Sequence, residues 1–137
     1  MINGVIARKL EILDTVLTEL RTLGTLDAQQ LAADWRTQRA VERDLQILVE
    51  IVIDICQRLI ALAGQAPAAT GGAAVERCIQ LGALSRHQNY HKMVQFRNFM
   101  VHRYEHVDSA LLINIINHHL TDFELFRDDI LSYVQHH

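Results

Sequence analysis

The sequence predicts an all-α protein, and three observations support this fold class. Leucine, isoleucine, alanine and valine are frequent, whereas the chain contains only six glycines and one proline, a composition that favours helices. Apolar residues recur in steps of three and four, which is the helical period. At 137 residues the chain can bury roughly two-thirds of its surface around one core, so we expect a single domain over residues 1–137.

The first predicted helix covers residues 2–23. Its apolar residues follow the four–three rhythm of a narrow helical seam: Ile6, Leu10, Leu13, Leu17 and Leu20. Gly24 follows as a C-terminal stop. Residues 25–33 are predicted to form a short connector, with room for one or two helical turns.

The second predicted helix, residues 35–63, is the longest, and Asp34 can cap it. Seven apolar residues keep the four–three rhythm along it: Val41, Leu45, Leu48, Val52, Ile55, Leu59 and Leu62. Ile47, Ile51 and Ile60 widen this face beyond what one partner helix needs. A face this broad favours bundle core, with contact to a second subunit as the less favoured alternative.

Three further predicted segments complete a bundle of about five helices. Residues 64–72, which include Pro67 and a Gly-Gly pair, form a linker that does not divide domains, because neither side could bury its apolar stripes alone. A short helix at 73–81 ends at Gly82. Ser85-x-x-Gln88 resembles a capping box that starts a helix over 86–103. Asp108-Ser109 is predicted to cap a last helix over 109–134.

The stretch from Ser85 to His106 is basic within an acidic protein. It holds four Lys and Arg residues and one Glu, a net charge of +3, whereas the whole chain carries −3; the remainder therefore carries −6. A basic island of this kind is typical of an anion site, and phosphate is the commonest biological anion. The alternative is an ordinary solvated helix face.

The spacing of three residues in this stretch restricts how they can act together. At roughly 100° per residue, Arg97 and Tyr104 lie within about 20° of each other on a helix, whereas His102 points roughly 140° away from Arg97. One straight helix cannot present all three on one face. Either the helix ends near His102 and the cluster sits at a corner before the next helix, or a second chain completes the site.

The eight histidines do not form a recognisable metal motif. His87 and His91 have the i,i+4 spacing that can hold one ion, but no histidine has a glutamate three residues before it, as a di-iron bundle requires. His118 and His119 are adjacent, so they point about 100° apart. We therefore expect no metal and no cofactor. Cys56 and Cys78 are predicted to be buried free thiols.

The chain shows no signal peptide and no apolar stretch of about 18 residues. We therefore expect a cytoplasmic protein that does not enter a membrane.

The pattern Arg97-Asn98-x-x-x-His102-x-Tyr104 resembles the signature of the HEPN superfamily in its HepT-like branch. The likeness extends over about residues 6–130, including the long second helix, the Gly/Pro linker and the Val107-Asp108 ending. One departure is Gln95, where many relatives have glycine. The resemblance implies an up-and-down helical bundle that forms a homodimer, with two Arg97/His102 sets facing each other across a basic groove.

The resemblance also implies an activity. HepT-like proteins are ribonuclease toxins, so this chain is expected to be the toxin of a type VII-like toxin–antitoxin system that cleaves RNA, such as tRNA or mRNA, without a metal. His102 would act as general base or acid, and Arg97 would hold the phosphate. Asn98 and Arg103 would position the substrate, and the product would end in a 2′,3′-cyclic phosphate.

The implied partner is an MntA-like nucleotidyltransferase antitoxin, which would neutralise the toxin by transferring AMP onto Tyr104. An alternative stays open at this point, because binding and cleaving a phosphodiester use the same residues. In that alternative the chain is a non-catalytic module that binds nucleotide or RNA and recruits the transferase.

Overall fold

The computed structural model describes residues 3–101 and 108–137, without the side chains of residues 98–101. The described part contains helices and no strand, which confirms the predicted all-α class. The prediction of about five helices is wrong, because the described residues form seven: α1 (Gly4–Arg21), α2 (Ala28–Ala33), α3 (Trp35–Leu62), α4 (Gly71–Gln80), α5 (Gln88–Val101), α6 (Ser109–His118) and α7 (Leu120–His136).

One additional helix, α2, occupies the predicted connector. Asp27 and Gln30 form a capping box there: the Asp27 carboxylate accepts from the Gln30 backbone N–H at 2.7 Å, and the Gln30 side chain accepts from the Asp27 N–H at 2.9 Å. Leu31 is fully buried. Reciprocal capping and one anchoring leucine therefore stabilise a helix of only six residues.

The second additional helix results from a break in the predicted last helix at His119. This residue has φ −125° and ψ 0°, and it is both the C-cap of α6 and the N-cap of α7. The apolar rhythm continues across the break through Leu112, Leu120 and Phe123, all of which are buried. The sequence therefore resembles one helix, although the backbone changes direction.

The start of α5 also differs from the prediction. The helix begins at Gln88, and the Ser85 hydroxyl donates to Asp129 at 2.8 Å instead of capping the helix. The predicted capping box is wrong because the serine hydroxyl donates its hydrogen bond to this carboxylate on α7. The cap predicted at Asp108 is confirmed, since its carboxylate accepts from the Ala110 N–H at 2.8 Å.

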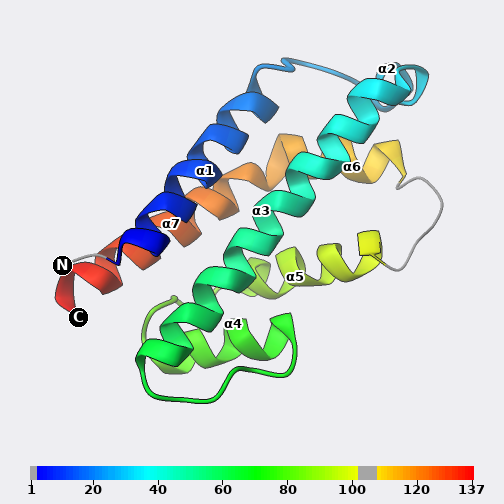
Figure 1. Ribbon diagram of the computed structural model, residues 1–137. Coiled ribbons are helices and arrows are strands. Elements are labelled where there is room, and N and C mark those ends of the chain that lie inside the picture. Colours follow the sequence, from blue (N-terminus) through cyan, green and yellow to red (C-terminus); the bar gives the residue numbers. More distant parts are fainter. Residues whose placement is uncertain (1–2, 102–107) are drawn as a thin grey trace.

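Helix α3 crosses the molecule and contacts α1, α2, α4, α5 and α6 (Figure 1). Helices α1 and α3 lie side by side, α4 lies near the C-terminal end of α3, and the start of α1 lies close to the end of α7. Of the three isoleucines that widen the apolar face of α3, Ile51 and Ile60 are buried, and Ile47 is partly buried and packs against the core. These residues pack within the chain, so they give no support to dimerisation. Leu62 fits the four–three rhythm of apolar residues but is 63% exposed, so the buried face of α3 ends before it.

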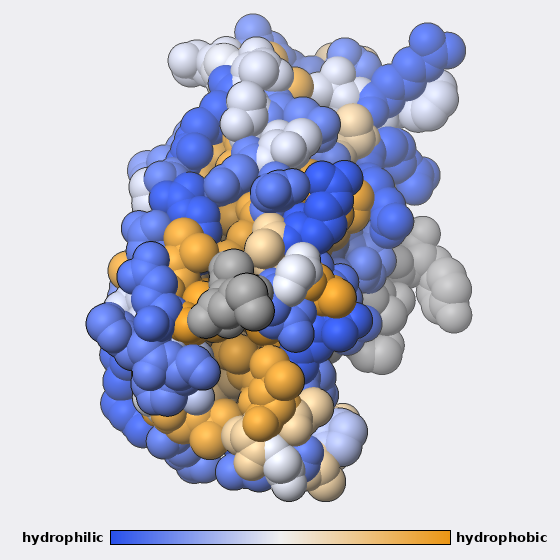
Figure 2. Space-filling view, turned by 60° about the vertical axis from the view of Figure 1, so that its left-hand side comes forward, coloured by the Kyte–Doolittle hydropathy of each residue, from blue (hydrophilic) through white to orange (hydrophobic). Residues whose placement is uncertain are grey.

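Figure 2 shows the side of the molecule on which the termini lie. Hydrophobic residues form a band down the middle of this face, with hydrophilic residues on both sides. Over the described residues, 3–101 and 108–137, no helix is both long and apolar enough to cross a membrane.

The two cysteines are buried and free, as predicted. The Cys78 thiol donates to the Cys56 carbonyl at 3.5 Å. The hydrogen bond with Cys78, followed by burial, raises the pKa of the Cys56 thiol well above its usual value. Both are core residues that join α3 to α4.

Candidate functional site

The N-terminal end of α5, the helix that carries the signature arginine, is held against α7 by one carboxylate. Oδ2 of Asp129 accepts from the backbone N–H of Ser85 at 3.0 Å and from the Tyr90 hydroxyl at 2.6 Å. Tyr90 is fully buried and packs edge-on against Phe126. Burial, followed by the hydrogen bond to Asp129, raises the pKa of Tyr90 well above that of a free tyrosine. These contacts give α5 a defined position in the bundle.

Part of the basic island is neutralised within the chain. Glu76 of α4 lies 3.6 Å from Arg86 and 3.2 Å from the His91 ring nitrogen. Over the described residues, neither Lys92 nor Arg97 has an ion-pair partner. The positive charge that remains available on α5 therefore lies at these two residues.

Arg97 is half-buried, and its Nε is a buried polar atom without a hydrogen-bond partner among the described residues. It lies four residues after Met93, so both side chains extend from the same face of α5. A buried donor without an acceptor costs about 1–3 kcal/mol, and native structures contain few of them. Arg97 therefore has unused hydrogen-bonding capacity at the C-terminal part of α5.

The remaining predicted site residues are Asn98, His102, Arg103 and Tyr104. Asn98 belongs to α5, but its side chain lies outside the described residues, and so do His102, Arg103 and Tyr104. Their arrangement around Arg97 stays a prediction. In the sequence, His102, Arg103 and Tyr104 follow Val101, the last residue of α5, and precede Ser109, the first residue of α6.

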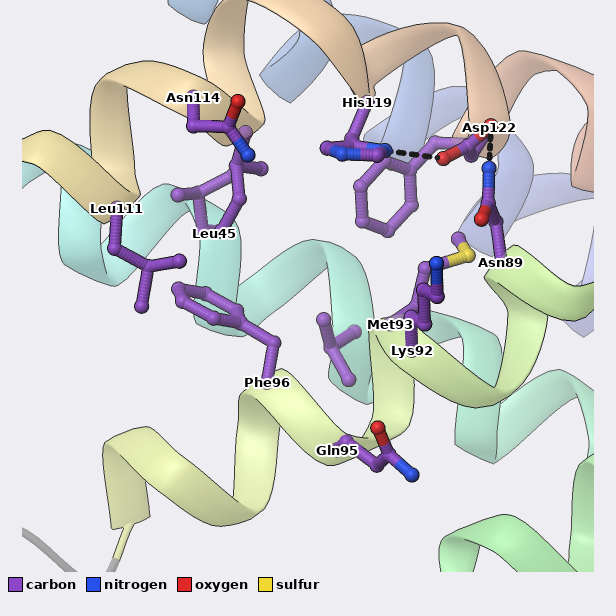
Figure 3. A pocket seen from close by; sticks show the side chains of 13 residues that line it. Leu45, Asn89, Lys92, Met93, Gln95, Phe96, Leu111, Asn114, His119 and Asp122 are labelled. Carbon is purple, nitrogen blue, oxygen red and sulfur yellow. Dashed lines mark hydrogen bonds and ion pairs between the residues drawn. The ribbon is translucent and has the colours of Figure 1, made fainter.

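A cavity of about 320 Å³, open to solvent, lies beside α5 and is lined by residues of α3, α5, α6 and α7. Figure 3 shows an apolar end, where Leu45, Phe96 and Leu111 approach one another from three helices. The other end is polar and contains His119, Asp122 and Asn89. Sequence patterns do not predict this cavity, because its walls come from four separate segments.

The polar end is organised around Asp122, whose residue exposure is only 8%. Its Oδ1 accepts from Asn89 Nδ2 at 3.1 Å, and its Oδ2 lies 3.0 Å from Nδ1 of His119 (Figure 3). A carboxylate can only accept, so Nδ1 carries the proton and donates. The sequence signal for this contact is the spacing His119-x-x-Asp122 at the start of a helix, which the adjacent pair His118 and His119 does not reveal.

The histidine pairs do not share an ion-binding site in this structure. His87 Nδ1 accepts from the Asn89 N–H at 3.2 Å, whereas His91 faces Glu76. His118 and His119 line different cavities. Within the described ranges, no group of three or more histidine, cysteine or acidic side chains is placed to hold a metal ion.

Comparison with known proteins assigns the fold to a family. A family model described as ribonuclease HepT-like matches residues 13–130. The mRNA nuclease HepT of Shewanella oneidensis is 28% identical over 106 residues, which cover 76% of this chain and 80% of that protein.

Solved structures agree with this assignment. The tri-AMPylated Shewanella oneidensis HEPN toxin in complex with MNT antitoxin has a TM-score of 0.84 and 25% identity, covering 96% of this chain and 99% of that chain. A toxin–antitoxin complex with AMP-PNP shares the fold, with a TM-score of 0.84, 24% identity, and coverage of 95% of this chain and 99% of that chain. The resemblance inferred from the signature is confirmed: this chain belongs to the HepT-like ribonuclease family.

Proposed function

We propose that this protein is a ribonuclease toxin of a type VII-like toxin–antitoxin system and cleaves RNA through Arg97 and His102. The observation that carries the proposal is Arg97 itself. In a chain of the HepT-like ribonuclease family, this arginine lies near the end of α5 with a buried Nε that has no acceptor among the described residues. An RNA phosphate is an anion that a planar guanidinium can bind through two hydrogen bonds.

In the proposed reaction, His102 removes the proton from a ribose 2′-hydroxyl. The 2′ oxygen attacks the adjacent phosphorus, the bond to the 5′ oxygen breaks, and the leaving oxygen takes a proton from the protonated His102 or from water. Arg97 stabilises the charge that builds on the phosphate oxygens, while Asn98 and Arg103 position the phosphate. The product ends in a 2′,3′-cyclic phosphate, and no metal is required. Proton transfer of this kind typically contributes about 10²- to 10⁴-fold.

We also propose that two chains form the working enzyme. The angle of roughly 140° between Arg97 and His102 on a helix is consistent with a site to which each subunit contributes one residue. A homodimer would bring two such sets together across one basic groove.

The proposed partner is an MntA-like nucleotidyltransferase that transfers AMP onto Tyr104. The solved relative in complex with MNT antitoxin is tri-AMPylated, and Tyr104 occupies the tyrosine position of the signature in this chain. Phosphates added there would repel the RNA backbone and compete for Arg97.

The first experiment tests cleavage. Purified unmodified protein should cut RNA in the presence of a chelator, and His102→Ala and Arg97→Ala should each abolish cutting. Arg97→Lys should recover little activity, because lysine cannot make the bidentate contact. Arg86→Ala is the matched control, since Arg86 is exposed and faces Glu76; it should cut at the normal rate. Activity that survives His102→Ala or requires a divalent metal would exclude this mechanism.

The second experiment tests the composite site. Sedimentation at micromolar concentration should give twice the mass of one chain. Mixing inactive Arg97→Ala and His102→Ala proteins should restore part of the activity if each site draws on both subunits. A monomer that still cleaves RNA would contradict this part of the proposal.

The third experiment tests regulation. Co-expression with the cognate transferase should add the mass of one or more AMP units and stop cleavage. Tyr104→Phe should block this addition and remain toxic in the presence of the partner. An unmodifiable chain that neither cuts RNA nor harms cells would favour a non-catalytic binding module instead.

A further inference from the structure

We propose that the cavity between α3, α5, α6 and α7 binds a single unstacked nucleobase of the RNA. This inference rests on the proposed function and deepens it, because it identifies where the protein distinguishes one RNA sequence from another.

The cavity has the size and lining of a small-ligand pocket. Its volume of about 320 Å³ falls within the range of about 300–1,000 Å³ for such sites, which are mainly apolar with a few polar groups. At the apolar end, the ring of Phe96 lies opposite Leu45 and Leu111 (Figure 3). A flat base can stack on an aromatic ring in this way, as single-stranded RNA commonly does on proteins.

The polar end can hydrogen-bond to the edge of a base. Asp122 accepts from Nδ1 of His119, which leaves the other ring nitrogen, Nε2, to hydrogen-bond with a base. The amide of Asn114, which lies on α6 near Leu45 and Leu111 (Figure 3), can both donate and accept. Bases present donors and acceptors on their edges, so this combination can distinguish one base from another.

The surroundings also suit RNA. Lys92 is exposed, has no ion-pair partner among the described residues, and lines the same cavity. A nucleotide whose base enters the cavity would therefore place its phosphate near this lysine. An apolar side chain from a protein partner would fill the hydrophobic end and would leave the hydrogen-bonding groups of Asn114 and His119 unused.

The test is a binding titration of the unmodified full-length protein, followed by NMR. The probes are AMP, CMP, GMP and UMP, with ribose 5-phosphate as the control without a base. At least one nucleotide should bind and shift the signals of α5 and α6, and ribose 5-phosphate should bind more weakly than that nucleotide. The same titration with His102→Ala protein separates base binding from cleavage.

Two variants test the cavity residues directly. Phe96→Leu keeps an apolar side chain but removes the ring, and it should weaken nucleotide binding by roughly tenfold or more. Asn114→Ala should reduce the difference in affinity among the four bases and broaden the choice of cleavage site. Asn117→Ala is the matched control, because Asn117 is also exposed on α6 but lines a different cavity; it should change neither property.

The outcomes separate this inference from the proposed function. Nucleotide binding that depends on Phe96 and Asn114 in a protein that cuts no RNA would support the pocket and contradict the ribonuclease. Cleavage with an unchanged choice of site in Asn114→Ala, together with no nucleotide binding, would overturn the pocket and leave the ribonuclease intact. If Phe96→Leu weakens the antitoxin complex and not nucleotide binding, the cavity is a protein-docking site and the inference is wrong.

Discussion

Two carboxylates of α7 connect this helix to the region where α5 begins, and they do so in different ways. Asp129 gathers three donors on one oxygen: the N–H and hydroxyl of Ser85 and the hydroxyl of Tyr90. Asp122 uses both oxygens, one for Asn89 and one for His119. Both therefore fix the same pair of helices.

The difference lies in what each carboxylate holds. Tyr90 is fully buried, and Asp129 accepts the hydrogen bond of its hydroxyl. The His119 side chain is 35% exposed and forms part of a cavity wall. Asp129 thus acts mainly on stability, whereas Asp122 also orients a side chain that faces a ligand-sized space. The same chemical group can serve packing at one end of a helix and recognition at the other.

The largest effect on stability is expected for Asp129→Ala. The substitution leaves the buried Tyr90 hydroxyl and the Ser85 N–H without their acceptor, which should cost about 2–4 kcal/mol of unfolding free energy. Urea denaturation measures this loss. Asp128→Ala is the control, because that carboxylate is 62% exposed, and its loss should cost less than about 0.5 kcal/mol. Equal effects at the two positions would show that Asp129 is not a structural anchor.

Asp122→Ala should destabilise less, by about 1–2 kcal/mol, because Asn89 and His119 can turn toward water in the cavity. It should nevertheless reduce discrimination among nucleotides, since His119 loses the acceptor that fixes its ring. Denaturation together with nucleotide titration measures both effects. A large loss of stability with unchanged discrimination among nucleotides would show that Asp122, like Asp129, acts on stability alone.

The pH dependence of stability should report on Tyr90. Its pKa in the folded protein is raised, so above about pH 10, where an unfolded tyrosine ionises, the unfolded chain binds fewer protons than the folded one. Unfolding free energy should therefore be fully retained below pH 10 and fall as the pH rises above it. Urea denaturation midpoints measured between about pH 8 and 11 test how steeply the unfolding free energy falls with pH. Tyr90→Phe should make this decrease with pH shallower. An unchanged decrease would show that other groups cause it.

The smallest effect on stability is expected for Lys92→Gln, since Lys92 is exposed and has no ion-pair partner among the described residues. Unfolding free energy should change by less than about 0.5 kcal/mol. RNA binding should weaken for all sequences, and the dependence of affinity on salt should decrease by about one unit of slope. Arg86→Gln provides the comparison, because Glu76 already faces Arg86. If RNA affinity depends on salt equally in Lys92→Gln and in the unchanged protein, the RNA does not contact Lys92.

Local sequence patterns predicted α1, α3 and the cap at Asp108 because those features depend on neighbours in the chain. The heptad-like rhythm from Val41 to Leu59 corresponds to a buried face of α3. The same reasoning failed at Ser85, where Asp129, 44 residues away, takes the side chain that would have capped α5. A capping motif indicates only that a serine can bond locally; a competing acceptor from another helix is not visible in the sequence.

The sequence by itself determined the helical class, the basic stretch and the Arg97-Asn98-x-x-x-His102-x-Tyr104 signature that identifies the family. These properties follow from composition and from short spacings along one chain segment. The tertiary structure alone decided that the excess apolar face of α3 is internal, and that Asn89, Phe96, Asn114 and His119 border one cavity. Such properties depend on which helices pack together, and the packing of α3, α5, α6 and α7 brings together residues that the sequence separates by up to 78 positions, from Leu45 to Phe123.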